Sequence, residues 1–188
     1  DRANDEALNV PDTDDINTDP AGYTQRSFTL AFRTGSDVNT RQVIYEEGGA
    51  TNGFNIYLDG GNLVASAWSE STNWNDQFSI SSSVSANTSY VITFVFDSTL
   101  SSDQLELFVD GTSAGTVTDA SIVEMDAHSG DIAIGNVLQN TQFNGTEEVS
   151  GDGGEGFTGH VAEVILSNDA LNTAQRQILE SDLSERYA

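Results

Sequence analysis

Residues 26–68, RSFTLAFRTGSDVNTRQVIYEEGGATNGFNIYLDGGNLVASAW, decide the fold class of this chain. Within them, runs rich in β-branched and aromatic residues alternate apolar with polar side chains, which is typical of strands that bury one face. These runs lie at 27–33, 41–47, 53–58 and 61–68. Clusters of Gly, Asn, Asp and Ser separate them, and Asp59-Gly60-Gly61-Asn62 supplies residues that tolerate the positive φ angles of a tight hairpin. The stretch therefore predicts an antiparallel sheet.

The same alternation continues to about residue 166, and Asp110-Gly111 joins two further runs as a second hairpin. The later runs lie at 76–80, 89–96, 104–109, 113–118, 131–135 and 157–167. Both prolines, Pro11 and Pro20, precede the first predicted strand, so every later strand can donate its backbone N–H groups to a neighbour. We therefore expect an all-β protein, an antiparallel β-sandwich. Residues 1–25 and 136–156 form the two long stretches without a strand pattern.

The last segment changes from a strand period to a helical one. Asn172 can cap a helix, and Gln175 follows three residues later, as in a capping box. An apolar stripe at helical spacing consists of Leu171, Ala174, Ile178, Leu179, Leu183 and Tyr187. We expect one amphipathic helix over 172–187, packed on the sandwich through this stripe. A length of 188 residues fits a single domain over 1–188, with 1–25 as an irregular acidic N-terminal segment.

The chain is strongly acidic, with 30 Asp and Glu against 6 Arg, a net charge of −24, and neither lysine nor cysteine. This composition excludes disulfides, thiolate metal sites and Schiff-base chemistry, and it argues against nucleic acid as a partner, because phosphate binding needs clustered cations. Apolar runs are far shorter than the roughly 20 residues that span a bilayer, so we expect no membrane insertion. The carboxylates concentrate in 1–19 and 146–155, where divalent cations would relieve their mutual repulsion.

Three segments together resemble a known family. Residues 26–68 are similar to the front half of a laminin G-like, concanavalin A-type jelly roll, and LELFVDGTSAGTV (105–117) resembles its midpoint hairpin. FTGHVAEVILSNDAL (157–171), followed by TAQRQILESDLSERY (173–187), is similar to its C-terminal signature. The acidic, lysine-free variant, with GDIAIGN at 130–136, looks most like the modules of bacterial repeats-in-toxin (RTX) adhesins.

This resemblance implies two antiparallel sheets, bound calcium, and recognition of glycans or other cell-surface ligands by loops at one rim. It also implies an extracellular location at the cell surface, as a module with neighbouring domains in a longer secreted chain. Residues 1–10 show no signal-peptide pattern, so an export signal would lie elsewhere in such a chain.

Calcium takes six to eight oxygen ligands, and two acidic segments offer that density of oxygens. In the first, Asp15, Asn17 and Asp19 alternate as at the start of a calcium loop, although Pro20 stands where an EF-hand has glycine. The alternative for this segment is a solvated acidic strand, which is the usual meaning of a charge run.

The second acidic segment is 136–156. In the related pentraxins, a loop at this place carries calcium together with a loop that precedes the strand equivalent to 53–58. By that resemblance, Asn52 would face 136–156 across the rim. The metal ligands then expected are Asn52, Asn140, Asn144, Glu147 and Asp152, with Gln142 and Glu155 contacting the bound ligand. The alternative is an acidic glycine-rich loop that binds nothing.

A tryptophan lies in the polar loop SESTNWNDQ (69–77). Trp74 is flanked by Asn73, Asn75 and Asp76, a combination suited to stacking on a sugar ring while the neighbours bind its hydroxyls. The alternative is that Trp74 folds back as a lid on the edge of the sandwich.

The leading hypothesis is a calcium-dependent, non-catalytic, carbohydrate-binding module of an adhesin, with its rim built from 49–52, 70–76 and 136–156. One alternative is a calcium-stiffened spacer or split-domain partner that positions neighbouring domains and binds nothing itself.

A glucanase is a further alternative, because the same jelly roll hosts enzymes with paired catalytic carboxylates. The only near match to their strand motif, Glu124 to Ser129, lacks the second Glu. Glu46 and Glu47 are consecutive on a predicted strand and so point to opposite faces.

Overall fold

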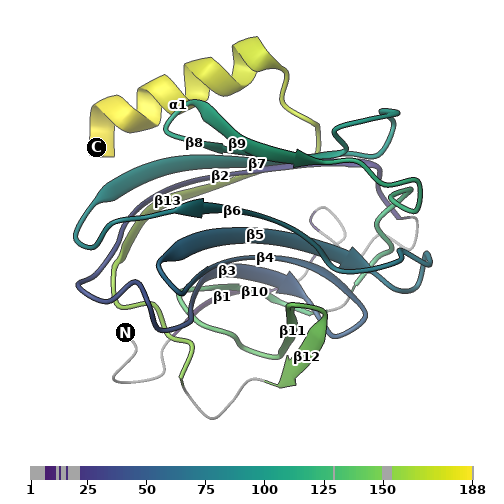
Figure 1. Cartoon of the computed structure of the whole chain (residues 1–188), viewed down its shortest axis with the longest axis horizontal. Helices are drawn as coiled ribbons and strands as arrows, with labels where there is room; N and C mark the ends of the chain where they lie inside the picture. The colour runs from purple at the N-terminus through teal and green to yellow at the C-terminus, as the bar shows by residue number, and fades with distance from the viewer. Residues whose placement is uncertain are drawn as a thin grey trace.

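The computed structural model describes residues 7–11, 13, 16, 22–128, 130–149 and 154–187, with only the backbone described at 147–149. Two large antiparallel sheets face each other (Figure 1). The first contains β1 (Leu8–Val10), β10 (Ile132–Ile134), β3 (Gln42–Gly48), β4 (Asn52–Asp59), β5 (Asn62–Ser69) and β6 (Phe78–Ser83), in that spatial order. The second contains β13 (His160–Ser167), β2 (Gln25–Arg33), β7 (Ser89–Asp97), β8 (Leu105–Val109) and β9 (Thr112–Val117). This confirms the predicted antiparallel β-sandwich.

The predicted strands and turns agree with the structure. Each alternating run overlaps an observed strand, with ends shifted by a few residues. The turn between β4 and β5 has Gly60 at a φ of 56° and Gly61 at 81°, and the turn between β8 and β9 has Asp110 at 48° and Gly111 at 78°. Positive φ at both central positions matches the twist of the flanking strands, which is why Asp-Gly and Gly-Gly pairs close these hairpins.

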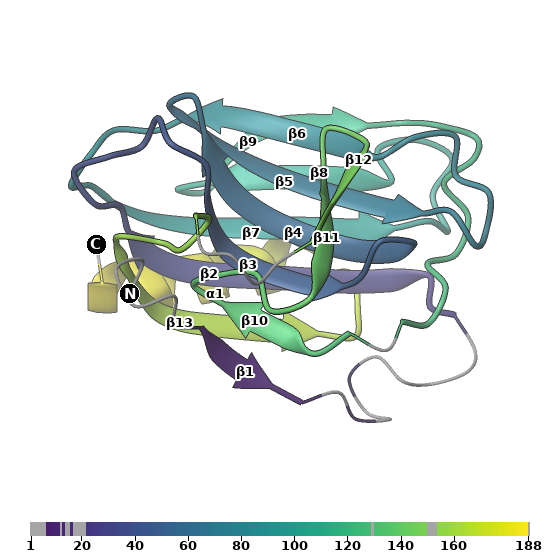
Figure 2. The ribbon, with the colours of Figure 1, turned by 90° about the horizontal axis from the view of Figure 1, so that it is seen from below.

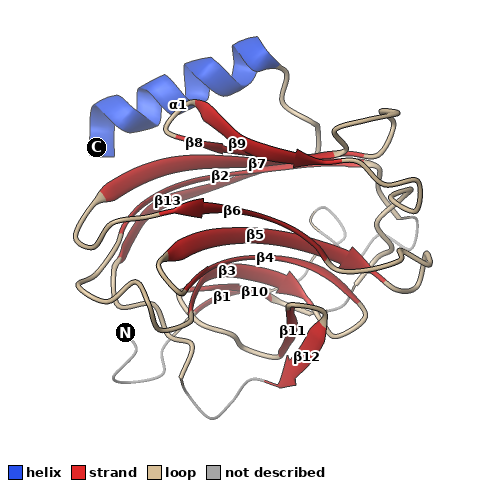
Figure 3. Cartoon of the chain, in the orientation of Figure 1, coloured by secondary structure: helices blue, strands red, loops and turns tan. Residues whose placement is uncertain are grey.

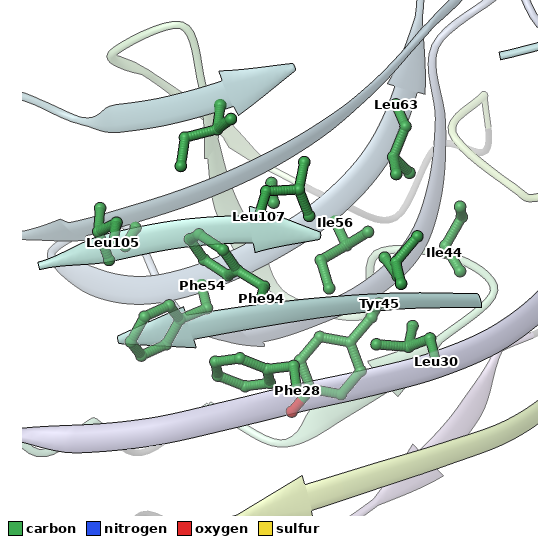
Figure 4. Close-up of a cluster of buried hydrophobic side chains, with 14 of the residues drawn as sticks. Phe28, Leu30, Ile44, Tyr45, Phe54, Ile56, Leu63, Phe94, Leu105 and Leu107 are labelled. Atoms are coloured by element: carbon green, nitrogen blue, oxygen red, sulfur yellow. The ribbon is translucent and has the colours of Figure 1, made fainter. Parts of the chain in front are cut away.

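The core lies between the two sheets and consists of the inward-facing residues of the alternating runs (Figure 4). Phe28 of β2, Phe54 of β4 and Phe94 of β7 are fully buried, and the ring centroids of Phe28 and Phe54 are 4.8 Å apart. Burial of apolar area contributes about 25 cal/mol per Å², so this layer of aromatic and aliphatic side chains is the main source of stability.

The segment 136–149 is not irregular, contrary to expectation. It contains a hairpin of β11 (Asn140–Phe143) and β12 (Thr146–Val149), which lies over the outer face of the first sheet (Figures 1 and 2). Phe143 packs edge-on against Tyr57, with the two ring centroids 4.9 Å apart. Both residues belong to a small second core that includes Val43 and Val137. The turn is Asn144-Gly145, with φ angles of 54° and 73°. An Asn-Gly pair is a strong hairpin signal, so the sequence did contain the information.

Helix α1 (Thr173–Tyr187) packs on the outer face of the second sheet, over β2 and β7 (Figure 3). The capping box is confirmed. Asn172 Oδ1 accepts from Ala174 N at 3.0 Å and Gln175 N at 3.1 Å, while Gln175 Oε1 accepts from Asn172 N at 3.0 Å. No helix in the described residues is long and apolar enough to cross a membrane.

The predicted apolar stripe of the helix is wrong in part. Ile178 is 73% exposed, and the buried positions are Arg176, Glu180 and Leu183. These residues share one helix face, and the opposite charges of Arg176 and Glu180 form an ion pair of 2.5 Å. The Arg176 guanidinium also lies 3.5 Å from the centroid of the Phe108 ring. The ion pair and the stacking on Phe108 offset the free-energy cost of burying these two charges. A prediction based on apolar residues alone therefore could not identify the buried face of the helix.

Candidate functional site at the rim of the sandwich

Hydrogen bonds join the loops β3–β4 and β5–β6 at one end of the first sheet. Glu70 N donates to Thr51 O at 2.9 Å. The Asn52 amide oxygen accepts from Ser71 N at 3.2 Å and Ser69 Oγ at 3.3 Å, and its nitrogen donates to Ser71 Oγ at 3.0 Å. This pairing holds the two loops in a fixed relative position.

The β11 strand adds the third segment of this rim. Gln142 Nε2 donates both to Ala50 O and to Glu70 Oε1, the latter at 2.9 Å. Gln77 Nε2 in turn donates to Gln142 O at 2.8 Å. The structure thus brings the expected rim segments 49–52 and 70–76 together with 136–142, the first part of the segment 136–156 that was expected there.

A cleft of about 840 Å³ opens at this rim. Its volume lies within the range of roughly 300–1,000 Å³ that is usual for ligand sites. The lining comprises Gly48–Asn52, Ser71, Asp126–His128, Gly130 and Leu138–Asn140. The wall formed by Asp126–His128 was not expected as part of the rim. Asn52 Nδ2 contacts Ala127 O at 3.4 Å, a long-range approach that no local pattern in the sequence indicates.

A smaller cavity of about 310 Å³ has both Glu70 and Gln142 in its lining. It collects several residues that were expected to bind a ligand, namely Trp74, Asn75, Asp76 and Gln142. Asn73 is not among its lining residues; it has a φ of 62° and donates its backbone N–H to Glu70 O at 3.0 Å, so it shapes the turn.

Trp74 does not form the exposed stacking surface that was predicted. The residue is only 6% exposed, and its ring lies 5.8 Å from Phe96 and 6.0 Å from Phe78 between centroids. The indole Nε1 donates to Glu124 O at 3.2 Å, which satisfies its polar group. The apolar ring is more stable at the edge of the core than in solvent, so the observed role is the alternative one, a lid on the sandwich.

Glu155 does not lie at the rim. Its backbone oxygen accepts from Val43 N at 2.6 Å, and its carboxylate is 3.8 Å from the Arg41 guanidinium. Val43 is near the start of β3 and the cleft begins at Gly48, where β3 ends. At about 3.3 Å per residue, the two places are roughly 15 Å apart, so the expected role of Glu155 in ligand contact is wrong.

The residues expected to bind calcium are only partly brought together. Asn52 and Asn140 both line the cleft, but the Asn52 oxygen is already occupied by two donors. Asn144 forms the β11–β12 turn. The others lie outside the described residues or side chains: Asp15, Asn17, Asp19, Glu147 and Asp152.

Within the described part of the chain, no three His, Asp or Glu side chains are grouped as metal ligands would be. Asp126 is the acidic residue that lines the cleft, and its Oδ1 accepts from Ala127 N at 3.0 Å. One carboxylate falls short of the oxygen-rich shell that calcium requires. The described residues alone therefore do not fit a calcium centre.

A buried ionic network lies behind the Asp126–His128 wall. Glu47 accepts from Arg26 Nη1 at 2.8 Å and from the Tyr45 hydroxyl at 2.5 Å, and His128 Nε2 lies 3.6 Å from its Oε1. Burial by itself raises the pKa of Glu47, but the neighbouring imidazole and the Arg26 charge outweigh burial and lower this pKa to about 2. The charged carboxylate thus anchors the Arg26 guanidinium and the Tyr45 hydroxyl beside this wall.

The near match to a glucanase motif does not have the geometry of one. Residues 124–128 lie outside the named strands, and Met125 makes only an isolated bridge to Tyr23. The Glu124 backbone oxygen accepts from Thr72 Oγ1 at 2.8 Å, so this segment closes the edge of the sandwich. The hairpin β11–β12 also covers part of the outer face of the first sheet.

Residues 4–175 match the family described as the Concanavalin A-like lectin/glucanases superfamily. The chain belongs to this superfamily. A search of curated proteins returned no match. The family covers both binding proteins and enzymes, so membership settles the fold and leaves the activity to the site.

Solved structures show the same concanavalin A-like fold. The binding domain of botulinum neurotoxin serotype D is 11% identical, with a TM-score of 0.65 over 94% of this chain and 39% of that chain. Botulinum neurotoxin type C, whose cell entry is described as dependent on interaction with two ganglioside molecules, is 13% identical, with a TM-score of 0.62 over 86% of this chain and 36% of that chain. The type DC binding domain in complex with SialylT is 12% identical, with a TM-score of 0.60 over 86% and 36%. This chain therefore spans little more than a third of each of those chains.

Proposed function

We propose that this chain is a non-catalytic module that recognises a carbohydrate at the rim cleft, as part of a longer adhesin at the cell surface. The observation that carries this proposal is the cleft itself, which is built from polar loops fixed on a rigid sandwich. The family includes lectins, and solved neighbours include toxin binding domains that are described with ganglioside or SialylT. These relatives support a binding role over a catalytic one.

The chemistry of the lining favours recognition of hydroxyl groups by hydrogen bonds. Asp126 offers a carboxylate, Thr51 and Ser71 offer hydroxyls, and Gln139 offers an exposed amide. A carboxylate can accept from two adjacent hydroxyls of one sugar ring, while hydroxyl and amide groups both donate and accept. No Phe, Tyr or Trp belongs to the described lining of this cleft. Stacking on a ring therefore contributes less here than hydrogen bonding.

Calcium dependence is a separate part of the proposal. The net charge of −24 supports it, because bound divalent cations would relieve the repulsion among the carboxylates. Since the described residues do not complete a calcium shell, further ligands would have to come from the acidic stretches around 12–19 and 150–153. Asp126 is the described carboxylate that lines the rim cleft.

The test is a glycan array probed with the purified chain, followed by calorimetric titration of the glycans that bind. Asp126→Asn keeps an oxygen acceptor and removes the charge, so we expect affinity to fall by about 10- to 100-fold, the usual range for a hydrogen bond to a charged group. Gln139→Ala should also weaken binding.

The matched controls are Asp103→Asn and Gln177→Ala, which are exposed residues outside the cleft lining. Both should bind as the wild type does. A blank array, or unchanged affinity in Asp126→Asn and Gln139→Ala, would show that this cleft is not the ligand site.

A further inference from the structure

A row of buried polar side chains crosses the outer face of the first sheet. Glu46 of β3 is the register partner of Asn55 of β4, and Asn55 is the partner of Ser66 of β5. All three are at most 1% exposed. Directly paired residues of an antiparallel sheet have Cα atoms about 4.5–5.5 Å apart and point to the same face. The Glu46 carboxyl group and the Asn55 amide are therefore close neighbours.

These two side chains fasten the β11 region to the sheet. Glu46 Oε1 accepts from Leu138 N at 3.3 Å. The Asn55 amide nitrogen donates to Thr141 Oγ1 at 3.0 Å and to Gln142 O at 2.6 Å. Leu138 belongs to the wall of the rim cleft, and Gln142 joins that wall to the other two loops. The position of the wall thus depends on Glu46 and Asn55.

Three oxygen atoms in this row lack a hydrogen-bond partner among the described residues: Glu46 Oε2, Asn55 Oδ1 and Ser66 Oγ, of which the Ser66 hydroxyl can donate or accept. Glu46 Oε2 and Asn55 Oδ1 are both shielded from solvent. An ionised carboxylate and an amide oxygen are both acceptors, so they cannot satisfy each other. A single proton on Glu46 turns this pair into a donor and an acceptor and removes both deficits at once.

We propose that Glu46 is a neutral carboxylic acid whose Oε2–H donates to Asn55 Oδ1, so that one proton holds the Leu138–Asn140 wall of the cleft against the sheet. The side chains at the flanking positions of the sheet, Ala133 of β10 and Asn55 of β4, carry no charge. Leu138, Thr141 and Gln142, the described contacts from the β11 side, are uncharged as well.

The electrostatics of the surroundings support this assignment. Burial raises the pKa of Glu46 to about 8; the Leu138 N–H opposes this rise, and the negative charge of Glu47 adds to it. The Glu47 side chain points to the other face, where Arg26 pairs with it. Loss of the proton above about pH 8 would place a buried carboxylate against Asn55 Oδ1. The wall would loosen, and the proposed glycan binding at the cleft would weaken.

The direct test is amide hydrogen exchange by NMR, comparing wild type with Glu46→Gln from about pH 6 to about pH 9.5. Glutamine imitates the neutral acid at every pH, since its amide can donate to Asn55 Oδ1 while its oxygen accepts from Leu138 N. We expect the protection of Leu138 N in the wild type, relative to the variant, to fall by up to about tenfold for each pH unit as the pH rises from about 6 to about 8, and to level off above about pH 8, where the proton is lost in the closed state as well. The amide of Gly135, which donates to Ile44 O at 2.9 Å, serves as the internal reference. The ratio of its protection in the wild type to its protection in Glu46→Gln should stay constant with pH.

A constant Leu138 ratio across this pH range would overturn the proposal. Restoration of Leu138 protection by calcium in the wild type, and not in Glu46→Gln, would also overturn it, because a cation and not a proton would then occupy the row. Glu106→Gln, on β8 of the other sheet, removes a carboxylate elsewhere and should behave as wild type.

The infrared spectrum gives a second readout that needs no variant. A neutral carboxylic acid has a C=O stretch that is absent from a carboxylate. This band should persist in the wild type at about pH 6.5, where ordinary carboxyl groups are ionised, and disappear on titration to about pH 9.5. Its absence at the lower pH would contradict the proposal. Neither experiment requires a ligand, so failure of the glycan proposal leaves this test unaffected.

Discussion

Glu46 and Glu47 show how far two adjacent residues can differ when they occupy opposite faces of a strand. Glu47 pairs with Arg26 and has a pKa lowered to about 2, whereas Glu46 has no cationic partner among the described residues and a pKa raised to about 8. The ordinary pKa of a glutamate side chain is 4.5, so the two pKa values are shifted in opposite directions. Side-chain direction alternates along a strand, so the same residue type is exposed to two unrelated environments.

The two carboxyl groups predict opposite effects of pH on stability. Glu47 binds fewer protons in the folded state, so its contribution is present above about pH 4.5 and lost as pH falls toward about 2. Glu46 binds more protons when folded, so its contribution is present below about pH 4.5 and lost as pH rises to about 8. Each slope has an upper limit of about 1.4 kcal/mol per pH unit. Urea unfolding of wild type and Glu46→Gln across this range measures both, and an unchanged slope above about pH 4.5 in Glu46→Gln would contradict the assignment.

Trp74 gives a second prediction for a single residue. Because its ring is buried against Phe96 and Phe78, Trp74→Ala should reduce the free energy of unfolding by about 3–5 kcal/mol. Trp74→Phe keeps most of the ring contact and loses the hydrogen bond to Glu124 O, so it should cost less. Denaturant unfolding measures both variants. If Trp74→Ala were as stable as wild type and lost ligand binding, the exposed stacking role would be right after all.

Among the elements, the C-terminal helix shows that local sequence predicts where a helix forms, whereas tertiary packing determines which of its faces is buried. The helix and its cap follow from local sequence, since Asn172 and Gln175 satisfy each other's backbone N–H groups within a single turn. The buried face depends instead on where the second sheet lies. Arg176 and Glu180 can face inward because Arg176 stacks on Phe108 and the two side chains form an ion pair with each other.

The helix therefore predicts unequal effects for two apolar residues. Leu183 is fully buried and Ile178 is 73% exposed. Leu183→Ala should cost about 2–5 kcal/mol of unfolding free energy, whereas Ile178→Ala should stay within about 0.5 kcal/mol of wild type. Thermal or denaturant unfolding decides this, and a larger loss in Ile178→Ala would favour the stripe expected from the sequence.

For the whole molecule, the dominant feature is a net charge of −24 on 188 residues. Mutual repulsion of this size destabilises a compact state, and salt screens it over a Debye length of about 10 Å at 0.1 M. We therefore expect the melting temperature to rise with sodium chloride concentration. Calcium at matched ionic strength should add a further increase that a chelator reverses, since specific binding to the folded state stabilises it by mass action. Equal melting curves with calcium and with sodium at matched ionic strength would refute the calcium part of the proposed function.

The strands, the Asp-Gly and Gly-Gly hairpins, the capped helix and the antiparallel sandwich could be predicted from the sequence alone. Each depends on contacts between residues a few positions apart, such as the alternation in β2 or the positive φ angles at Gly60 and Gly61. The rim segments at 49–52 and 70–76 were expected from the family resemblance and from the polar loop around Trp74, and not from the strand pattern. The β11–β12 hairpin was signalled by Asn144-Gly145, although the acidic composition around it favoured an irregular loop.

Which polar groups contact one another could not be predicted, because it depends on how distant segments pack. The approach of Asn52 to Ala127, the wall at Asp126–His128 and the displacement of Glu155 to the far end of β3 all join segments distant in the chain. The exposure of Trp74 and the charge states of Glu46 and Glu47 likewise depend on what lies above and below each side chain. Local patterns report backbone preference and the period of burial, whereas a binding site depends on long-range packing and on the desolvation that packing brings.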